Sequence, residues 1–309
     1  MNMPDRAGYL THYESGDLVR RVHAAFQHLS SCDICPLHCG VDRTAGELGV
    51  YQTGLKAQVS SFGPHAGEER PISGRRGSGT IFFSRCNLHC IYCQNADISQ
   101  LSFGKEYDAV GLAGIMLNLQ AMGCHNINLV SPSHVVPQIL AAVTEAAKRG
   151  LHLPLVYNTG EYDSLEMLAL LDGVVDIYMP DMKYGDAETA LRYSRIPKYP
   201  EINQQAVLEM YRQVGDLQVD TDGIARRGLL VRHLVLPNNN ANSDIILRFL
   251  AEQVSKKGYL NLMAQYHPAY LADSLPDLNR RITRQEYQQV ISLVKEAGLA
   301  NLDAQYDYM

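Results

Sequence analysis

The stretch TIFFSRCNLHCIYCQN, residues 80–95, joins a short apolar segment to three closely spaced cysteines. Residues 80–84 are mostly apolar and follow a glycine, which predicts a buried β-strand. Cys86, Cys90 and Cys93 come directly after it with Cys-x3-Cys-x2-Cys spacing. Soft thiolate ligands favour iron–sulfur clusters or zinc. Because three thiolates leave one iron of a four-iron cluster without a protein ligand, such a cluster would have room for a further ligand.

Downstream of this loop the sequence alternates between short apolar segments and helical ones. Six β-then-α units imply an α/β fold, a partial, TIM-like (β/α)6 barrel of parallel strands, with ligands beyond the carboxyl ends of the strands. Capping-box spacing at Asp163/Glu166 and at Thr283/Glu286 marks two helix starts. Gly298 ends the last helix. The further strands are expected at 126–130, 153–157, 174–179, 229–236 and 259–264, and the helices at 108–121, 135–149, 163–171, 186–213 (broken by prolines), 243–256 and 283–297.

The N-terminal quarter lacks this alternation of apolar and helical segments. We expect an extension over residues 1–78 and a core domain over 79–309. Apolar residues at helical spacing predict one helix near residues 18–29, whereas 40–79 is rich in Gly, Ser and Pro and is expected to form loops. Cys32, Cys35 and Cys39 form a second triplet with Cys-x2-Cys-x3-Cys spacing. A closed metal site needs four donors. Either a metal binds here, with His38, His65 or Tyr51 as the fourth ligand or with one iron left open, or the thiols are reduced and structural.

Composition excludes several classes of function. The 309 residues carry 27 Lys and Arg against 33 Asp and Glu, a net charge of −6, which argues against a nucleic-acid partner. Residues 109–144 lack charge, but polar residues and prolines divide them into pieces too short to span a membrane. No secretory signal is visible at the start, so we expect a cytoplasmic protein with reduced cysteines. Cys124 stands alone and is expected to pack as a small apolar residue.

The cysteine loop, its place after the first strand and the six βα units resemble the radical S-adenosylmethionine (radical SAM) superfamily. The resemblance implies that Cys86, Cys90 and Cys93 hold a 4Fe–4S cluster whose open iron binds S-adenosylmethionine. It further implies reductive cleavage of that cofactor to a 5′-deoxyadenosyl radical, which abstracts hydrogen from a substrate. The chain is most similar to the branch of iron–sulfur proteins homologous to the pyruvate formate-lyase activating enzyme.

The same resemblance assigns residues to the cofactor. Tyr92 matches an aromatic beside the adenine, and Asp181 and Lys183 match an Asp-x-Lys signature, the alternative being a surface ion pair. Asn158 and Thr159 match an Asp-Thr pair that helps to bind a monovalent cation, but Asn158 lacks the charge of the Asp. Ser131 and Ser133 stand where the methionine amino group is bound, or else cap a helix. Arg232 is expected to face the cofactor, while the adjacent His233 either does so or is a core residue.

Two further expectations follow for the surroundings of the cofactor. His65, Glu68 and Glu69 either lie over the barrel mouth and contact substrate or belong to a solvated loop. A flavodoxin- or ferredoxin-type protein would donate the electron.

Three functions are compatible with the sequence. The first is an oxidoreductase that abstracts hydrogen from a glycine of a glycyl-radical enzyme. The second is radical SAM modification of another protein, peptide or small molecule. The third is a non-catalytic zinc or iron–sulfur binding module.

Overall fold

All six expected strands form and lie side by side in one sheet of the computed structural model, which describes residues 6–101 and 103–304. Neighbouring strands among the six are parallel, and the curled sheet does not close on itself within the described residues, as expected for a partial barrel. One further parallel strand, β10 (Asn301–Ala304), pairs with β9. The six are β2 (Ser78–Phe83), β4 (Ile127–Val130), β5 (Leu155–Thr159), β6 (Ile177–Pro180), β8 (Ala225–Leu234) and β9 (Tyr259–Met263).

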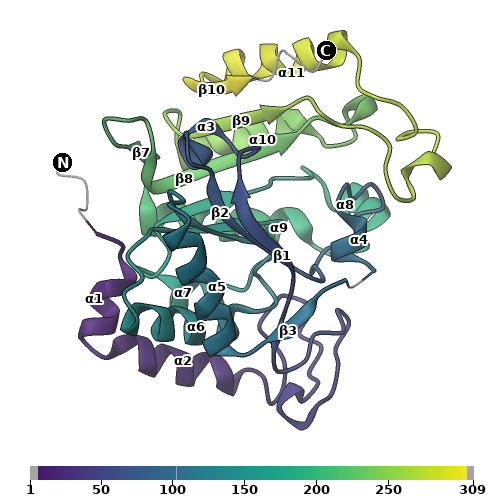
Figure 1. Ribbon diagram of the computed structural model, residues 1–309. Helices are drawn as coiled ribbons and strands as arrows, with labels where there is room; N and C mark the ends of the chain where they lie inside the picture. Colours follow the sequence, from purple (N-terminus) through teal and green to yellow (C-terminus); the bar gives the residue numbers. More distant parts are fainter. Residues whose placement is uncertain (1–5, 102, 305–309) are drawn as a thin grey trace.

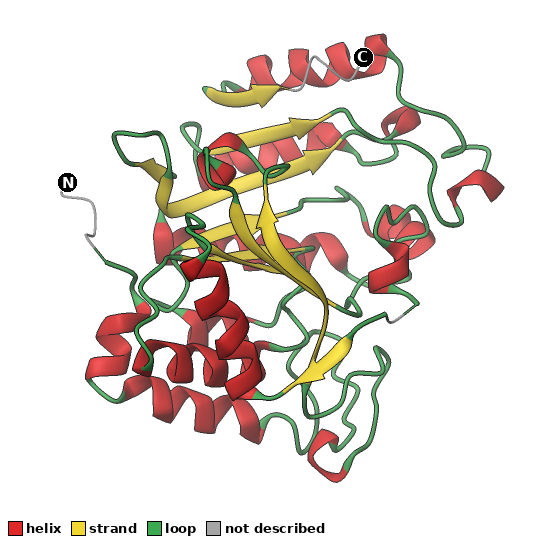
Figure 2. Cartoon of the chain, viewed as in Figure 1, coloured by secondary structure: helices red, strands yellow, loops and turns green. Residues whose placement is uncertain are grey.

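Helices cover the outer side of this sheet, as the red and yellow elements of Figure 2 show. The expected helix at 243–256 divides into α10 (Ser243–Phe249) and a π-helical turn (Leu250–Val254). A two-residue strand, β7 (Gln218–Val219), pairs with β8. The other helices after β2 are α4 (Ala96–Ser99), α5 (Ala109–Ala121), α6 (Val136–Lys148), α7 (Leu165–Leu171), α8 (Ala187–Ser194), α9 (Tyr199–Val214) and α11 (Arg284–Ala297).

Of the two helix caps predicted from the sequence, the one at α11 is confirmed and the one at α7 is not. Thr283 and Glu286 form the expected capping box of α11, and Gly298 ends that helix in the left-handed region at φ 73°. The expected cap at Asp163 is wrong. Ser164 caps α7 instead, while Asp163 is buried and accepts hydrogen bonds from the hydroxyls of Tyr157 and Thr159.

The N-terminal region is more regular than expected. It forms two helices, α1 (Tyr9–Glu14) and α2 (Asp17–Gln27), which lie against α6 at the lower left of Figure 1. The expectation of loops over 40–79 is wrong, because β1 (Ala57–His65) pairs antiparallel with β2 and also with β3 (Lys105–Tyr107). The ladder hydrogen bonds with β2 outweigh the weak strand propensity of the Ser, Gly and Pro residues in β1.

A short helix, α3 (Arg70–Ser73), packs inside the curled sheet near the amino ends of its strands. Its Ile72 is fully buried against inward-facing side chains of β5, β6 and β8, among them Val156, Ile177 and Leu230. The segment that connects β1 to β2 therefore fills the amino end of the barrel.

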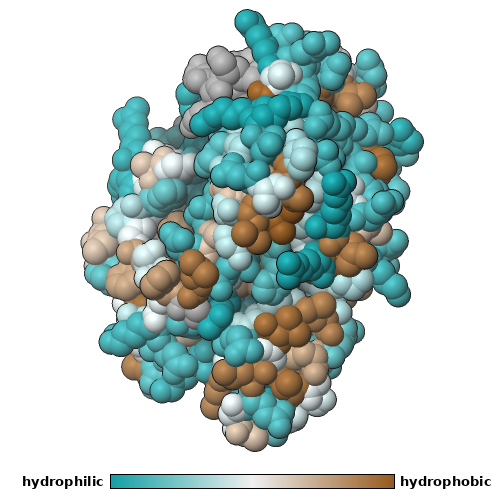
Figure 3. Space-filling model, turned by 90° about the vertical axis from the view of Figure 1, so that its right-hand side faces the viewer, coloured by the Kyte–Doolittle hydropathy of each residue, from teal (hydrophilic) through white to brown (hydrophobic). Residues whose placement is uncertain are grey.

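The molecular surface is mixed. Figure 3 views the side toward which β8 and β9 run, and apolar residues form separate brown patches there on a mostly hydrophilic surface. None of the helices among the described residues combines the length and apolar character that crossing a membrane requires.

Candidate active site

Cys86, Cys90 and Cys93 lie on the loop between β2 and α4, at the carboxyl end of β2. Each sulfur has a polar neighbour. The Leu88 N–H donates to Cys86 Sγ at 3.4 Å, and the Ser194 hydroxyl donates to Cys90 Sγ at 3.0 Å. Cys93 Sγ lies 3.2 Å from Ser99 Oγ. Such donors stabilise thiolates, so the three sulfurs fit the ligand set that an iron–sulfur cluster needs.

Contacts with distant segments hold this cysteine loop in place. The Asn87 side chain donates to the Tyr162 carbonyl after β5, and Ile91 bonds through its backbone to Tyr193 of α8 and to Leu271. A Cβ at Gly160 would lie 2.4 Å from Leu88 Cδ1, so the two loops approach each other closely at this glycine.

Tyr92 lies behind the cysteines in a buried aromatic cluster. Its ring packs edge-on against Tyr184 and Tyr266, with centroids 6.3 and 5.9 Å away. Its side chain is therefore part of a packed wall beneath the loop.

Burial raises the pKa of the Cys86 thiol to about 12 and also raises that of Cys90, an effect that Lys183 partly opposes. Metal binding would deprotonate these thiols. Among the described residues no three His, Cys, Asp or Glu side chains gather closely enough to hold a single metal ion. An iron–sulfur cluster does not require the thiolates to meet at one ion, because each thiolate binds a different iron.

Arg232 forms the centre of a buried charged group inside the barrel. Its Nε donates to Asp181 Oδ1 at 2.6 Å, and one terminal nitrogen donates to Asn158 Oδ1 at 2.8 Å. Lys183 Nζ lies 2.9 Å from Asp181 Oδ2. The sequence predicted these four residues from three separate strands, and the structure brings all four into contact.

This group is not a surface ion pair. The Asp181 and Lys183 side chains are only 19% and 20% exposed. Burial by itself raises the pKa of Asp181, but the charges of Arg232 and Lys183 outweigh it and hold that pKa at about 2. Asp181 is therefore a carboxylate at any physiological pH.

Glu68 and Glu69, which lie just before α3, also reach the charged group. Glu68 Oε2 lies 3.3 Å from Arg232, and Glu69 Oε1 lies 3.9 Å from it. Asn128 of β4 donates to Glu68, and Asn261 of β9 donates to Glu69.

These contacts correct the expectations for this segment. Glu68 and Glu69 belong neither to a solvated loop nor to the barrel mouth, because they enter the interior from the amino end, beside α3. His65 is exposed at the end of β1 and pairs with Ser78 at the start of β2. Asn128 and Asn261 escaped the sequence analysis because a lone Asn in an apolar strand carries no motif.

The residues after β4 form a second polar group that does not touch Arg232. Ser133 Oγ lies 3.0 Å from Thr159 Oγ1, which donates to Asp163. Thr159 follows Asn158 and so points to the other side of β5. Ser131 adopts a left-handed conformation at φ 58°. Neither serine caps α6, whose N-cap is Val135 without a side-chain bond, so the capping alternative is wrong.

His233 is a core residue. It is fully buried, and its two ring nitrogens lie 2.7 Å from the Met182 carbonyl and 2.8 Å from Ser243 Oγ. Burial lowers its pKa to about 4, so the ring is neutral. Cys124 is likewise buried in the main core, as expected.

The N-terminal cysteines lie in a compact loop between α2 and β1. Cys32 and Cys35 are buried, and Cys39 is half-buried with its Sγ 3.8 Å from the Cys32 carbonyl. Burial raises the pKa of Cys35 to about 12. Of the three candidate fourth ligands, His38 and His65 are exposed, whereas Tyr51 is buried.

Tyr51 connects this loop with the cysteine loop after β2. Its ring stacks on that of His89 with centroids 5.5 Å apart. Burial raises the pKa of the Tyr51 phenol, and the neighbouring thiols of Cys35 and Cys86 act in the same direction. The two cysteine triplets, separate in sequence, therefore lie on either side of one tyrosine.

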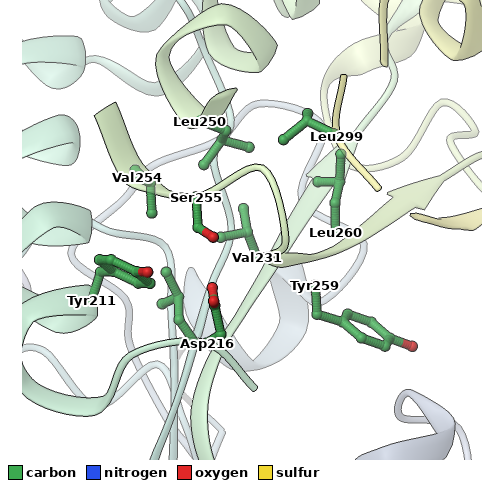
Figure 4. A pocket seen from close by; sticks show the side chains of 11 residues that line it. Tyr211, Asp216, Val231, Leu250, Val254, Ser255, Tyr259, Leu260 and Leu299 are labelled. Atoms are coloured by element: carbon green, nitrogen blue, oxygen red, sulfur yellow. The ribbon is translucent and has the colours of Figure 1, made fainter. Parts of the chain in front are cut away.

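A small pocket elsewhere in the fold is unrelated to this site. It lies among α9, β8, β9 and the π-helical turn, where Tyr211, Asp216, Val231 and Leu250 are among its walls (Figure 4). None of the predicted site residues lines it.

The chain was compared with protein-family models, with solved structures and with known sequences. No protein-family model matches the chain. Among solved structures it is similar to a radical SAM methyltransferase from Sphaerobacter thermophilus (12% identity, 73% of this chain and 65% of that chain, TM-score 0.47). It is also similar to HydG, a maturase of the FeFe-hydrogenase (12% identity, 71% and 49%, TM-score 0.47). Methylornithine synthase is a third such structure (15% identity, 73% and 70%, TM-score 0.46).

Sequence comparison gives one relative. The uncharacterized protein MJ0674 of Methanocaldococcus jannaschii is 30% identical over 295 residues, which cover 93% of this chain and 80% of that protein. The chain therefore belongs to the same family as MJ0674.

Proposed function

We propose that this protein is a radical SAM enzyme. The observation that carries the proposal is the placement of three free thiols at the carboxyl end of β2, beside a buried charged group built by β5, β6 and β8. Lys183 belongs to that group, and its positive charge lowers the pKa of the Cys90 thiol. The charged group and the cysteine loop are therefore neighbours. Bound there, a 4Fe–4S cluster would supply the electron that cleaves S-adenosylmethionine to the radical that abstracts hydrogen.

The protein's own residues would bind and orient the cofactor. Arg232 and Lys183 offer two positive charges to its carboxylate, and Asp181 holds both side chains in position. Tyr92 would pack near the adenine. Ser131 and Asn158 would complete the cofactor side of the site. Ser133 and Thr159, which contact each other on the other side of β5, would hold the ends of β4 and β5 in position. A monovalent cation beside Asp181 is a further element of the proposal.

For the substrate, we propose a glycine of a partner glycyl-radical enzyme, as in the activating enzymes that the sequence resembles. The alternative is another protein, a peptide or a small molecule. The electron would come from a low-potential protein of the flavodoxin or ferredoxin type.

The decisive experiment is cofactor cleavage by the anaerobically reconstituted chain. With dithionite and S-adenosylmethionine, the wild type is expected to yield 5′-deoxyadenosine, and Cys90→Ala is expected to yield none. Cys124→Ala is the matched control, since it removes a buried thiol outside the loop and should retain activity. A chain that binds zinc or iron but forms no 5′-deoxyadenosine would instead be a binding module.

A second experiment separates the two substrate proposals. Electron paramagnetic resonance of the active enzyme mixed with a candidate glycyl-radical partner should show a glycine radical. If cleavage proceeds and candidate partners encoded beside its gene remain free of radical, the alternative substrate class is favoured.

A further inference from the structure

Arg43 is a buried cation without a carboxylate partner. The residue is 3% exposed, and its guanidinium donates to the carbonyls of Gly54 and His134. In the part of the chain that the structure describes, no Asp or Glu forms an ion pair with it. A buried charge is costly unless an opposite charge lies near, so the surroundings of Arg43 need a negative group.

The groups that can carry this negative charge are the N-terminal thiols. Arg43 Nη1 lies 4.0 Å from Cys32 Sγ, and Cys39 and Cys35 are its next electrostatic neighbours. Three neutral thiols would leave the guanidinium unpaired. Thiolates bound to metal would give it a counter-charge.

Tyr51 supplies an independent observation. It is 8% exposed, and its hydroxyl has no hydrogen-bond partner among residues 6–101 and 103–304. The turn that carries it packs directly on the thiols, since a Cβ at Gly49 would lie 2.7 Å from Cys39 Sγ. Buried hydroxyls are normally satisfied, so this orphan beside three cysteines indicates a missing ligand.

We propose that Cys32, Cys35 and Cys39 bind a second iron–sulfur cluster, with Arg43 as its counter-charge and the Tyr51 hydroxyl at the fourth position. Zinc fits less well because it requires four donors in a tight tetrahedron. The thiols are not gathered around a point that a single ion would occupy. In a cluster each thiolate binds its own iron, so the sulfurs stand farther apart.

The stacking of Tyr51 on His89 places the second cluster next to the first. His89 lies inside the loop of Cys86, Cys90 and Cys93. The second cluster would accept one electron from a low-potential one-electron donor protein and pass it to the first, with no bond made or broken. Only this destination of the electron rests on the proposed function.

Metal analysis of cysteine variants tests the site without any need for activity. After anaerobic reconstitution of the full chain with iron and sulfide, the C86A/C90A/C93A variant should keep roughly half of the wild-type iron and sulfide. The same variant with C32A/C35A/C39A added should keep none. Zinc, or no metal, in C86A/C90A/C93A would overturn the proposal. If that variant keeps its cluster while the wild type fails to cleave S-adenosylmethionine, only the proposed function fails.

Two further measurements address Tyr51 and the electron path. Y51F in the C86A/C90A/C93A background should change the electron paramagnetic resonance spectrum of the remaining cluster, and an unchanged spectrum would remove Tyr51 from the site. The reduced wild type should show magnetic coupling that is absent from the summed spectra of C86A/C90A/C93A and C32A/C35A/C39A. Should C32A/C35A/C39A fail to fold, the Y51F comparison and the iron content of C86A/C90A/C93A still decide whether the second cluster exists. Spectra without magnetic coupling would contradict electron transfer between the two clusters.

Discussion

At the scale of single residues, Arg232 determines whether the interior of the barrel is electrostatically balanced. One guanidinium contacts Asp181, Asn158 and Glu68, which come from three different segments. Removing one member of a buried charge pair costs more than the pair itself contributes, because the remaining charge stays buried and unpaired.

We therefore expect Arg232→Met to lower the free energy of unfolding by about 3–5 kcal/mol. Arg232→Lys should recover part of that loss, since it keeps the charge but not the forked geometry. Denaturant unfolding measures both variants. The control is Arg248→Met on the exposed side of α10, expected to change stability by less than about 0.5 kcal/mol. Equal effects of R232M and R248M would contradict this account.

Asp176 gives a prediction about pH. It is buried and accepts hydrogen bonds from the N–H groups of Gly8 and Leu155 at 2.8 and 2.9 Å. Burial raises its pKa to about 6 although these bonds oppose the shift. The folded protein thus holds this proton more tightly than the unfolded chain does. The stability that the group contributes is full below pH 4 and is lost as the pH rises to 6.

The stability of the wild type relative to Asp176→Asn should therefore fall by about 2 kcal/mol between pH 4 and pH 7. The comparison with D176N cancels the titration of the other carboxyls. Denaturant unfolding of both chains at four pH values gives the difference. A difference that stays constant over this range would show that Asp176 has no raised pKa in the folded state.

At the scale of helices and strands, α11 begins at a capping box that the sequence predicted from the spacing of Thr283 and Glu286. The Thr283 hydroxyl accepts a hydrogen bond from the Glu286 N–H, and the Glu286 carboxylate accepts one from the Thr283 N–H. We expect Thr283→Ala to cost about 1 kcal/mol in the free energy of unfolding and Thr283→Ser to cost little. Gln285→Ala, an exposed change in the same turn, is the control and should be neutral. Equal stability of T283A and T283S would exclude a capping role.

Elements with such local signals could be predicted from the sequence, and those that depend on distant partners could not. The six parallel strands carry mostly apolar runs, and the cysteine spacing marks the loop at the end of β2. In contrast, only Ala57 and Val59 of β1 are buried, so its strand character comes from pairing with β2. The contact between Glu69 and Asn261 joins residues 192 positions apart, and no local pattern encodes it.

At the scale of the whole molecule, the expected division at residue 78 can be tested against the packing. Residues before it contribute β1 to the sheet, Ile72 to the amino end of the barrel and Glu68 to the charged group. Arg43 also donates to the His134 carbonyl after β4. A chain of residues 79–309 would lose all four interactions, exposing one edge of β2 and leaving Arg232 without the two carboxylates of Glu68 and Glu69.

We therefore expect residues 79–309 alone to lack cooperative folding, while a chain that starts at Arg6 keeps each of these contacts and unfolds in one transition. Circular dichroism during thermal unfolding compares the two. We expect the N-terminal quarter and the barrel to unfold as one cooperative unit because of the buried contacts between them. Without the N-terminal quarter, the fragment would have to remain folded with an unfilled interior and an unpaired strand edge. A sharp transition in the fragment would instead show that the strands and helices after residue 78 are sufficient for the fold.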